Sequence, residues 1–310
     1  MADPAPVLEL VDLVCIHGSG ADALRAVDGV TLSIPPGRTL GLVGESGCGK
    51  STLARAVAGL MAPSAGAVRI DGRDWPVARL ADRRARARRV QMVFQDPFGS
   101  LNPRLSVAQI VGEPLVVHRM PDVDRKVSAL LDRVGLTEAQ GRRYPHELSG
   151  GQRQRVAIAR ALALDPRILV CDEPVSALDV SIQAQVLNLL SDLQRDLGLA
   201  YLFISHDLSV IRYVADRIAV MYRGRIVEEG ASDAVWTAPA HPYTRALIAA
   251  IPGADRLADL PRAVPPGAER PGACRFRHRC PLVQEICDTE PGLAAVGPDH
   301  RAACHLAPRA

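Results

Sequence analysis

The chain carries the octapeptide Gly44-Glu45-Ser46-Gly47-Cys48-Gly49-Lys50-Ser51, which matches the pattern G-x-x-x-x-G-K-S/T. A short apolar run, Leu40–Val43, comes directly before it, and a helical pattern extends from Lys50 to Leu60. This order predicts a strand, a glycine-rich loop and a helix, whose N–H groups converge on phosphate oxygens. A glycine-rich turn without a ligand is the alternative, and the flanking strand and helix argue against it.

Three residues of this loop, which we call the P-loop, have separate expected roles. Lys50, one of only two lysines among 37 basic residues, is expected to reach the β- and γ-phosphates as a compact point charge. Ser51 is expected to ligate Mg²⁺. Cys48 precedes a helix N-terminus, where the pKa of a thiol tends to fall, although a small residue without a chemical role is the favoured interpretation.

A second apolar run carries two adjacent carboxylates. Residues 168–171 are a predicted strand, and Asp172 and Glu173 follow it directly. Ligands bind at the carboxyl ends of strands in open α/β sheets, so this pair is expected to face the P-loop. Asp172 is then expected to hold Mg²⁺, and Glu173 to act as the general base that polarises the attacking water.

Composition and charge narrow the class of protein. The 310 residues are 48% hydrophobic and 23% charged, which is typical of a soluble globular protein. The net charge of +3 argues against nucleic-acid binding driven by overall charge. No run approaches 18 apolar residues, and the first four residues do not resemble a secretory signal, so a cytosolic protein is expected.

The organisation along the chain predicts an α/β fold. Apolar strand patterns at 67–70, 90–94, 168–171 and 201–204, a helix at 184–197 and a hairpin at 218–228 alternate along the sequence, which indicates a mainly parallel sheet. The arginine-rich segment 79–89 has no interleaved aromatic residues and is predicted to be a solvated helix face rather than a nucleic-acid patch. Five prolines from residue 252 to residue 272 predict a linker or an extended surface segment.

Further motifs give the sequence a resemblance to the ATP-binding cassette (ABC) ATPases. Leu148-Ser149-Gly150-Gly151-Gln152 resembles the signature motif of that family. Gln95 follows a predicted strand as a Q-loop glutamine does, Ser176-Ala177-Leu178-Asp179 resembles the D-loop, and Ser205-His206-Asp207 resembles the switch-histidine motif. With the P-loop and the carboxylate pair, the set stands in the order that the family has.

The resemblance implies a fold and a domain division. The fold is α/β: a P-loop NTPase core of the ABC ATPase type with an antiparallel β subdomain, an inserted helical subdomain at about 96–158 and a small Cys-rich C-terminal extension. Residues 1–250 are expected to form the nucleotide-binding domain, and residues 251–310 a Pro-rich linker and a Cys-rich metal-binding segment.

The resemblance also implies roles for single residues. Glu173 and His206 are expected to be catalytic, with His206 contacting the γ-phosphate and Gln95 sensing Mg²⁺ beside Ser51 and Asp172. The signature is expected to face ATP bound by a second subunit, with Asp179 in the D-loop between them. The expected ATP-binding residues of the chain itself are Gly44, Glu45, Ser46, Gly47, Cys48, Gly49, Lys50, Ser51, Thr52, Gln95 and His17, and those acting in trans are Ser149, Gly150, Gly151 and Gln152.

One departure from the family concerns adenine. ABC domains usually stack adenine on an aromatic residue upstream of the P-loop, and the stretch Val14–Gly18 contains no Tyr, Phe or Trp. His17 is the nearest planar ring and could stack on the base, or it could be a surface histidine.

Two stretches narrow the resemblance to the dipeptide/oligopeptide importers. Residues 144–147 and 171–185 resemble their ATPases, and the F-type subunit more than the D-type. The implied function is an ATPase that energises a peptide ABC importer from the cytoplasmic face of the membrane. Its implied partners are a D-type subunit, two membrane permeases and an extracytoplasmic peptide-binding protein, without nucleic acid.

Several alternatives to this function stay open at the level of sequence. One is a soluble ABC ATPase that acts on nucleic acid or ribosomes, although neither a second cassette nor a long coiled-coil insertion is visible. Another is an importer ATPase for a non-peptide solute such as a nickel chelate. A third is an iron–sulfur redox protein that merely binds nucleotide. The identity of the partner subunit is also open, since it could be a second copy of this chain instead of a D-type relative.

Four cysteines crowd into the last 37 residues, spaced Cys274-x5-Cys280-x6-Cys287-x16-Cys304. In a chain without an export signal, such a cluster indicates metal binding before disulfides. The spacings are wider than those of zinc ribbons, and the family resemblance favours a 4Fe-4S cluster. His278, His300 and His305 keep Zn²⁺ open as one alternative, and a segment without a metal is the other.

Overall fold

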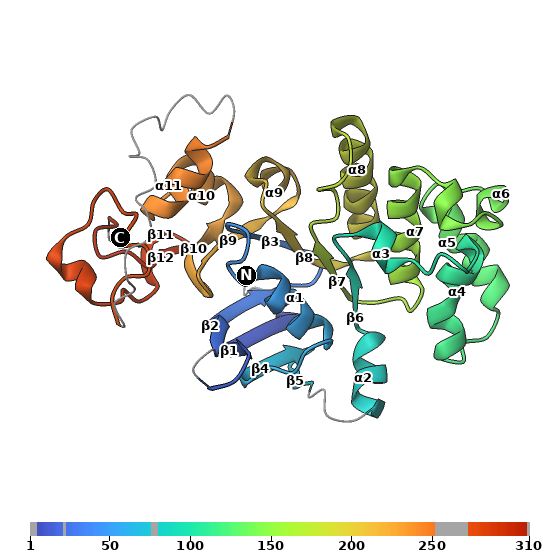
Figure 1. Cartoon of the computed structure of the whole chain (residues 1–310), viewed down its shortest axis with the longest axis horizontal. Coiled ribbons are helices and arrows are strands. Elements are labelled where there is room, and N and C mark those ends of the chain that lie inside the picture. Colours follow the sequence, from blue (N-terminus) through green and yellow to red (C-terminus); the bar gives the residue numbers. More distant parts are fainter. Residues whose placement is uncertain (1–4, 21–22, 76–79, 252–271, 309–310) are drawn as a thin grey trace.

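A central β-sheet organises the molecule, and a smaller antiparallel sheet packs against it (Figure 1). This computed structural model describes residues 5–20, 23–75, 80–251 and 272–308. Within those residues the central sheet has eight strands in the order β11-β12-β10-β9-β3-β8-β7-β6. Its strands are β3 (Thr39–Val43), β6 (Val90–Val93), β7 (Ile168–Asp172), β8 (Ala200–Ser205), β9 (Arg217–Tyr222), β10 (Arg225–Ala231), β11 (Ala294–Gly297) and β12 (His300–Ala302).

The strands from β6 to β9 run parallel to one another. Every residue of β3, β7 and β8 is buried, because both faces of this part of the sheet are covered, and the sequence accordingly reads as continuous apolar runs. Their side chains alternate between two cores: Tyr201 and Phe203 face one, and Leu202 and Ile204 face the other. The predicted hairpin is confirmed, since β9 and β10 pair antiparallel around Arg223–Gly224.

The smaller sheet is antiparallel in the order β2-β1-β4-β5, as the predicted fold class requires. Leu8, Leu10 and Leu13 of its strand β1 join Leu53 and Val57 of helix α1 in one core, so α1 lies between the two sheets. The elements of this layer are β1 (Leu8–His17), β2 (Leu24–Ile34), β4 (Ala65–Ile70), β5 (Arg73–Asp74) and α1 (Lys50–Ala58).

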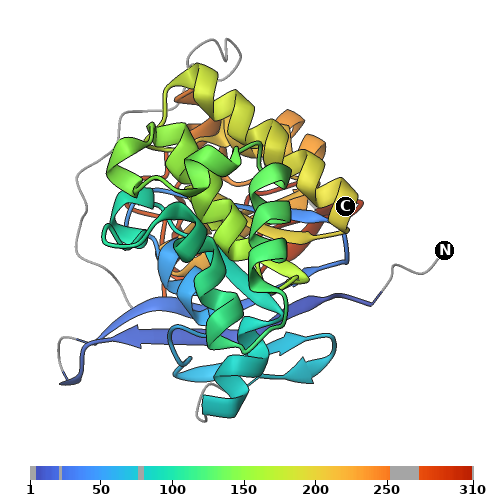
Figure 2. The same cartoon turned by 90° about the vertical axis from the view of Figure 1, so that its right-hand side faces the viewer.

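A group of helices covers one end of the central sheet and lies in front of it in Figure 2. The group comprises α3 (Pro97–Ser100), α4 (Val107–Val117), α5 (Val123–Arg133), α6 (Glu138–Gly141), a 3-10 turn (Pro145–Glu147) and α7 (Gly150–Leu162). Helix α7 is the innermost, since eight of its side chains are buried against α4, α5 and the sheet. The sheet is also covered by α8 (Val180–Leu197) and α9 (Leu208–Val214).

The C-terminal segment, residues 272–308, extends the central sheet at the opposite end (Figure 1). Strand β12 pairs antiparallel with β10, and β11 pairs with β12. The segment also packs beside α11 (Pro242–Ala249), which follows α10 (Ser232–Thr237). Most of the predicted Pro-rich linker, residues 252–271, lies outside the described residues.

One sequence expectation needs correction here. The arginine-rich segment forms helix α2 (Leu80–Ala87), but it is not uniformly solvated, because Arg86 is 1% exposed. Its guanidinium donates to the carbonyl oxygens of Ala56, Val57 and Trp75, and so neutralises the C-terminal carbonyls of α1. Over the ranges that the structure describes, no helix is both long and apolar enough to cross a bilayer.

Candidate functional site

The P-loop closes tightly around the start of α1, which explains its glycines. Gly44 (φ 155°) and Gly49 (φ 112°) have backbone conformations that L-residues rarely adopt. A Cβ on Gly49 would lie 1.9 Å from the carbonyl oxygen of Ala26, and a Cβ on Gly44 would lie 2.2 Å from that of Met221. The loop therefore accepts no side chain at either position.

Lys50 is buried inside this loop, with 5% of its surface exposed. Its Nζ donates to the carbonyl oxygens of Gly44 at 2.7 Å and Glu45 at 2.9 Å. The ammonium is thus held at the loop by two backbone oxygens, at the N-terminal and positive end of α1. A cation in this position favours the binding of a multiply charged anion, such as the phosphate chain of a nucleotide.

Ser51 and Asp172 lie side by side, with Ser51 Oγ donating to Asp172 Oδ1 at 3.2 Å. They come from α1 and from the carboxyl end of β7, two elements that pack against each other. Burial raises the pKa of the Asp172 carboxyl, while the Ser51 hydrogen bond and the charge of Lys50 lower it. A hydroxyl and a carboxylate are oxygen ligands of the kind that Mg²⁺ prefers, so the pair fits that ion.

Three predicted residues converge on one carboxylate oxygen. Gln95 Nε2 donates to Glu173 Oε2 at 2.9 Å, and His206 Nδ1 lies 3.1 Å from the same oxygen. They follow β6, β7 and β8, which are adjacent and parallel, so their carboxyl ends meet at one edge of the sheet. Glu173 has a left-handed backbone (φ 48°), held by the hydrogen bond from its N–H to Ile204 O at 2.9 Å.

The signature residues form the start of α7. Ser149 caps the helix: Gln152 N–H donates to Ser149 Oγ at 3.3 Å, and Ser149 N–H donates to Gln152 Oε1 at 3.0 Å. A Cβ on Gly151 would lie 2.6 Å from Ile182 Cγ2, so α7 approaches α8 closely there. Asp179 is the N-cap residue of α8. Within the described residues these hydrogen bonds are local, and none joins the signature to the P-loop of its own chain.

His17 and Cys48 lie at the rim of the P-loop and at its centre, respectively. His17 ends β1, is exposed, and its Nε2 is 3.0 Å from Thr52 Oγ1 in the first turn of α1. Burial raises the pKa of the Cys48 thiol more than the charge of Lys50 lowers it. The tendency of a thiol pKa to fall at a helix N-terminus is therefore not realised at Cys48, because desolvation outweighs the charge of Lys50.

The prediction of a 4Fe-4S cluster on Cys274, Cys280, Cys287 and Cys304 is also wrong. Over the described residues, no group of three or more His, Cys, Asp or Glu side chains is arranged to hold a metal ion, which removes the zinc alternative as well. Burial raises the pKa of the Cys274 thiol to about 11 and also raises the pKa values of the Cys280 and Cys304 thiols.

Two of the three histidines near these cysteines, His300 and His305, have other partners, whereas the buried Nε2 of His278 has none among the described residues. His300 is buried, and its Nε2 lies 2.7 Å from Glu228 Oε1. His305 Nε2 lies 3.0 Å from the carbonyl oxygen of Thr289. The His300 contact attaches the C-terminal segment to β10, and the His305 contact lies within the segment itself.

Two residues at the P-loop were missed by sequence reasoning. The Glu45 N–H donates to Tyr243 Oη at 2.8 Å, and Arg279 donates from both terminal nitrogens to the two Glu45 carboxylate oxygens, each at 2.7 Å. Arg279 is 234 positions from Glu45, so no local pattern could pair them. The sheet brings the two together by adding the C-terminal segment beside the P-loop.

Comparisons with known proteins agree with this geometry. Residues 27–176 match the family described as "ABC transporter", and residues 227–287 match "Oligopeptide/dipeptide transporter, C-terminal region". The oligopeptide transport ATP-binding protein AppF of Bacillus subtilis is 46% identical, over 91% of this chain and 90% of its own length. The protein OppF of Salmonella typhimurium, with the same description, is 48% identical over 87% of this chain and 84% of its own.

Solved structures give the same answer for the fold. The cbiO1 protein of Clostridium perfringens, part of the ABC transporter complex cbiONQ, superposes with a TM-score of 0.68 at 29% identity, over 75% of this chain and 91% of its own. The ATP-binding cassette MJ0796 was solved as a dimer in a post-hydrolysis state with ADP and Pi. It superposes with a TM-score of 0.66 at 29% sequence identity, over 73% of this chain and 98% of its own.

These findings, with the P-loop and the carboxylate pair, define an ATP-hydrolysing cassette, and the chain belongs to the ABC transporter family. Within that family it belongs to the ATP-binding proteins of the oligopeptide and dipeptide transporters. The predicted family and the ABC ATPase core of the predicted fold class are thereby confirmed, whereas the Cys-rich C-terminal extension of that prediction is not.

Proposed function

We propose that this chain hydrolyses ATP to drive the import of peptides through a membrane complex. The observation that carries the proposal is the convergence of Gln95 and His206 on the Glu173 carboxylate, next to the Ser51–Asp172 pair. The names of the relatives, which describe oligopeptide transport, support peptides as the cargo over a nickel chelate, and transport over action on nucleic acid or ribosomes.

In the proposed reaction each residue acts on a defined atom. The P-loop N–H groups and Lys50 bind the β- and γ-phosphates, and the adjacent Thr52 and His17 would contact the rest of the nucleotide. Mg²⁺, when bound, neutralises charge on the phosphates, and Ser51, Asp172 and Gln95 are the residues that would hold it. Glu173 accepts the proton of the attacking water, and His206 donates a hydrogen bond to the γ-phosphate.

A second cassette completes the proposed site. Ser149, Gly150, Gly151 and Gln152 lie at the N-terminus of a 13-residue helix and would bind the γ-phosphate held by the partner, with Asp179 between the subunits. Support comes from the dimeric state of the related cassette MJ0796. We propose a D-type relative, rather than a second copy, as the partner.

The helical group is the proposed contact with two membrane permeases at the cytoplasmic face of the membrane. Exposed apolar side chains on it support this role: Phe98 is 62%, Val116 63% and Tyr144 43% exposed. Because α3 follows Gln95 directly, closure at the nucleotide could be passed to that surface. An extracytoplasmic binding protein would supply the peptide. The division into domains at about residue 250 stays a prediction.

Reconstitution tests the proposal. The chain is assembled with a D-type cassette, its permeases and its binding protein in liposomes, and uptake of a labelled oligopeptide is measured with ATP and with a non-hydrolysable analogue. Uptake that requires hydrolysis is the expected result. ATP turnover that drives uptake of another solute, and of no peptide, would contradict the proposed cargo and leave the ATPase in place.

A further inference from the structure

We infer that Arg279 is a positioning residue for the nucleotide site, which holds the P-loop in its phosphate-binding shape through Glu45. The C-terminal segment then acts as a support for the P-loop, in addition to extending the sheet. The inference rests on the proposed binding of ATP at the P-loop. It concerns a segment whose cysteines and histidines hold no metal in the described residues.

The first contact is a two-point ion pair. Arg279 Nη1 and Nη2 donate to Glu45 Oε2 and Oε1, each at 2.7 Å. A planar guanidinium with two parallel hydrogen bonds fixes the direction of the carboxylate as well as its distance. The guanidinium is itself positioned by the rings of Tyr222 and Phe276, whose centroids are 5.9 and 5.7 Å from its central carbon.

The second contact holds the backbone of the same residue. The Glu45 N–H donates to Tyr243 Oη at 2.8 Å, and the Tyr243 side chain is completely buried. Its ring packs against Tyr222 and Phe276, with centroids 4.6 and 5.5 Å away. The side chain and the backbone of Glu45 are therefore both held by one aromatic cluster, to which the C-terminal segment contributes Phe276.

The position of Glu45 bears directly on Lys50. The Glu45 carbonyl oxygen accepts a hydrogen bond from Lys50 Nζ at 2.9 Å, so a turn of the Glu45 peptide displaces an acceptor of the phosphate-binding lysine. Holding Glu45 preorganises the loop before ATP arrives.

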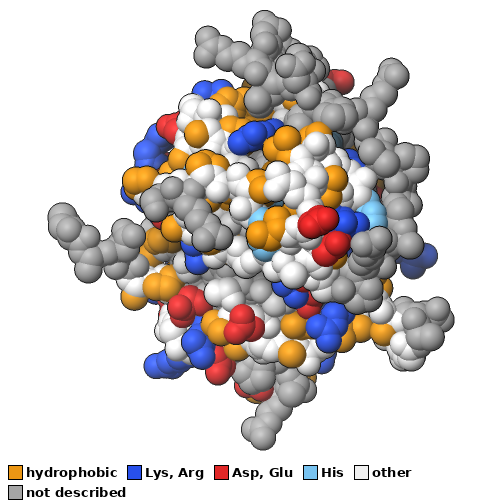
Figure 3. Space-filling model, turned by 90° about the vertical axis from the view of Figure 1, so that its left-hand side faces the viewer, with side chains coloured by type: hydrophobic (Ala, Val, Ile, Leu, Met, Phe, Trp, Pro, Cys, Tyr) orange, Lys and Arg blue, Asp and Glu red, His pale blue; other side chains and the backbone are white. Residues whose placement is uncertain are grey.

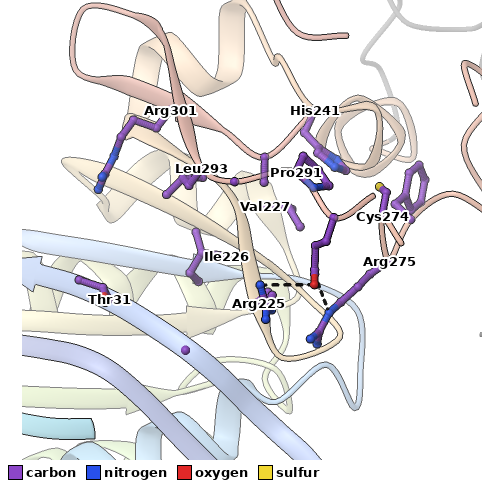
Figure 4. A pocket seen from close by; sticks show the side chains of 15 residues that line it. Thr31, Arg225, Ile226, Val227, His241, Cys274, Arg275, Pro291, Leu293 and Arg301 are labelled. Carbon is purple, nitrogen blue, oxygen red and sulfur yellow. Dashed lines mark hydrogen bonds and ion pairs between the residues drawn. The ribbon is translucent and has the colours of Figure 1, made fainter. Parts of the chain in front are cut away.

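The segment that carries Arg279 is itself fixed. Arg275 reaches Asp28 of β2, the carbonyl oxygen of Arg223, and Glu290 at 3.0 Å. Arg225 Nη1 and Arg275 Nε lie 3.4 and 3.0 Å from the two carboxylate oxygens of Glu290. Figure 4 labels the two arginines and draws these contacts as dashed lines. Acidic and basic side chains lie interspersed over this end of the molecule (Figure 3). A cavity of 560 Å³ lies between the P-loop and the segment, where Gly47 and Cys48 line it together with His278.

The test is steady-state ATP hydrolysis by the complete transport complex. Arg279→Gln removes the charge and one of the two hydrogen bonds, and we expect it to raise the KM for ATP about fivefold while kcat changes less than about twofold, because loop preorganisation is lost and the reacting residues are untouched. Glu45→Gln is expected to raise the KM similarly. The double variant should be no worse than either single variant, since both remove the same contact.

Arg277→Gln is the matched control. Arg277 lies in the same segment but pairs with Asp288 at 2.6 Å instead of with the P-loop, so its loss should leave the KM for ATP unchanged. Arg279→Lys keeps the charge without the two-point geometry, and an intermediate KM is expected. It also replaces Arg279→Gln if that variant does not fold.

Three results would overturn the inference: a wild-type KM in folded Arg279→Gln, effects of Arg279→Gln and Glu45→Gln that add, or an equal rise in Arg277→Gln. Each leaves the proposed function standing if the wild-type complex still couples hydrolysis to peptide uptake. Conversely, a complex that hydrolyses ATP without transporting peptide, but shows the expected KM pattern, contradicts the proposed cargo and supports the role of Arg279.

Discussion

At Glu173, a single carboxylate oxygen receives both the Gln95 amide and the His206 ring. This arrangement links the residue that would accept a proton to two residues that would sense the nucleotide. The left-handed backbone of Glu173 keeps this carboxylate at the end of the strand. Glu173 thus has a strained backbone conformation at the position where the proposed general base lies.

Glu173→Gln is expected to keep ATP binding and to lower kcat by at least about 100-fold, because the amide cannot accept the proton of the attacking water. Gln retains the shape of the side chain, so binding of ATP, measured by equilibrium titration, should stay within about twofold. Hydrolysis is measured on the assembled complex. Turnover near the wild-type rate would remove Glu173 from the reaction.

Lys50→Ala is expected to weaken ATP binding at least about tenfold, because it removes the buried ammonium that faces the phosphates. The other lysine, Lys126 on α5, supplies a control: Lys126→Ala should bind ATP as the wild type does. Both variants are compared by equilibrium binding of a fluorescent ATP analogue. An unchanged affinity in Lys50→Ala would contradict the role given to this residue.

At the scale of single elements, two helices begin with the same device. Ser106 with Gln109 caps α4, and Ser149 with Gln152 caps α7, each through a reciprocal pair of hydrogen bonds. The two caps differ in their surroundings, since only the second belongs to the signature motif. Comparing substitutions at the two caps therefore separates the contribution of an N-cap to stability from a contribution of Ser149 to ATP hydrolysis.

Ser149→Ala and Ser106→Ala are each expected to lower the free energy of unfolding by about 1 kcal/mol, the usual effect of losing an N-cap. Urea unfolding measures that loss. Only Ser149→Ala should also lower ATP hydrolysis by the complex, since only this hydroxyl would contact the partner's γ-phosphate. Equal activity in the two variants would show that Ser149 is a cap and nothing more.

Helix α2 offers a second test at this scale. Arg86→Ala removes the donor to the carbonyl oxygens of Ala56, Val57 and Trp75 and leaves buried acceptors unpaired, which we expect to cost about 3 kcal/mol of unfolding free energy. Arg84→Ala, an exposed position on the same helix, should cost less than about 0.5 kcal/mol. Similar unfolding curves for the two variants would contradict the buried role of Arg86.

At the scale of the whole molecule, the C-terminal strands β11 and β12 extend the central sheet at one edge. The buried Glu228 carboxylate of β10 accepts from the N–H groups of Ala240 and His241 and contacts His300 of β12. Its neighbour Glu229 pairs with Arg301, whose side chain is half exposed. Two adjacent residues of β12 thus attach the segment by a buried contact and by an exposed one.

His300→Ala is expected to lower the free energy of unfolding by about 2 kcal/mol, because it leaves part of a buried carboxylate unpaired. Arg301→Ala should cost less than about 1 kcal/mol, since water replaces the partner of an exposed pair. Thermal unfolding of the full chain compares them. The reverse order would mean that the exposed pair, rather than the buried Glu228 contact, holds the segment.

The sequence by itself determined the local machinery of this protein. Residues 39–58 form a strand–loop–helix unit within a short stretch of chain, and the positions of Gln95, Asp172, Glu173 and His206 at strand ends follow from the apolar runs before them. The antiparallel subdomain and the helical insertion came with the family resemblance. Such features are readable because adjacent residues fix them through backbone geometry and periodicity.

Only the tertiary structure decided the contacts between distant segments and the environment of single groups. Arg279 meets Glu45 across 234 positions, Arg86 is buried under α1, and Cys48 has a raised pKa where its position alone predicted a lower one. The cysteine spacing indicated a metal that the folded arrangement does not support. Burial and long-range pairing depend on how the sheet adds its strands, and no local pattern carries that information.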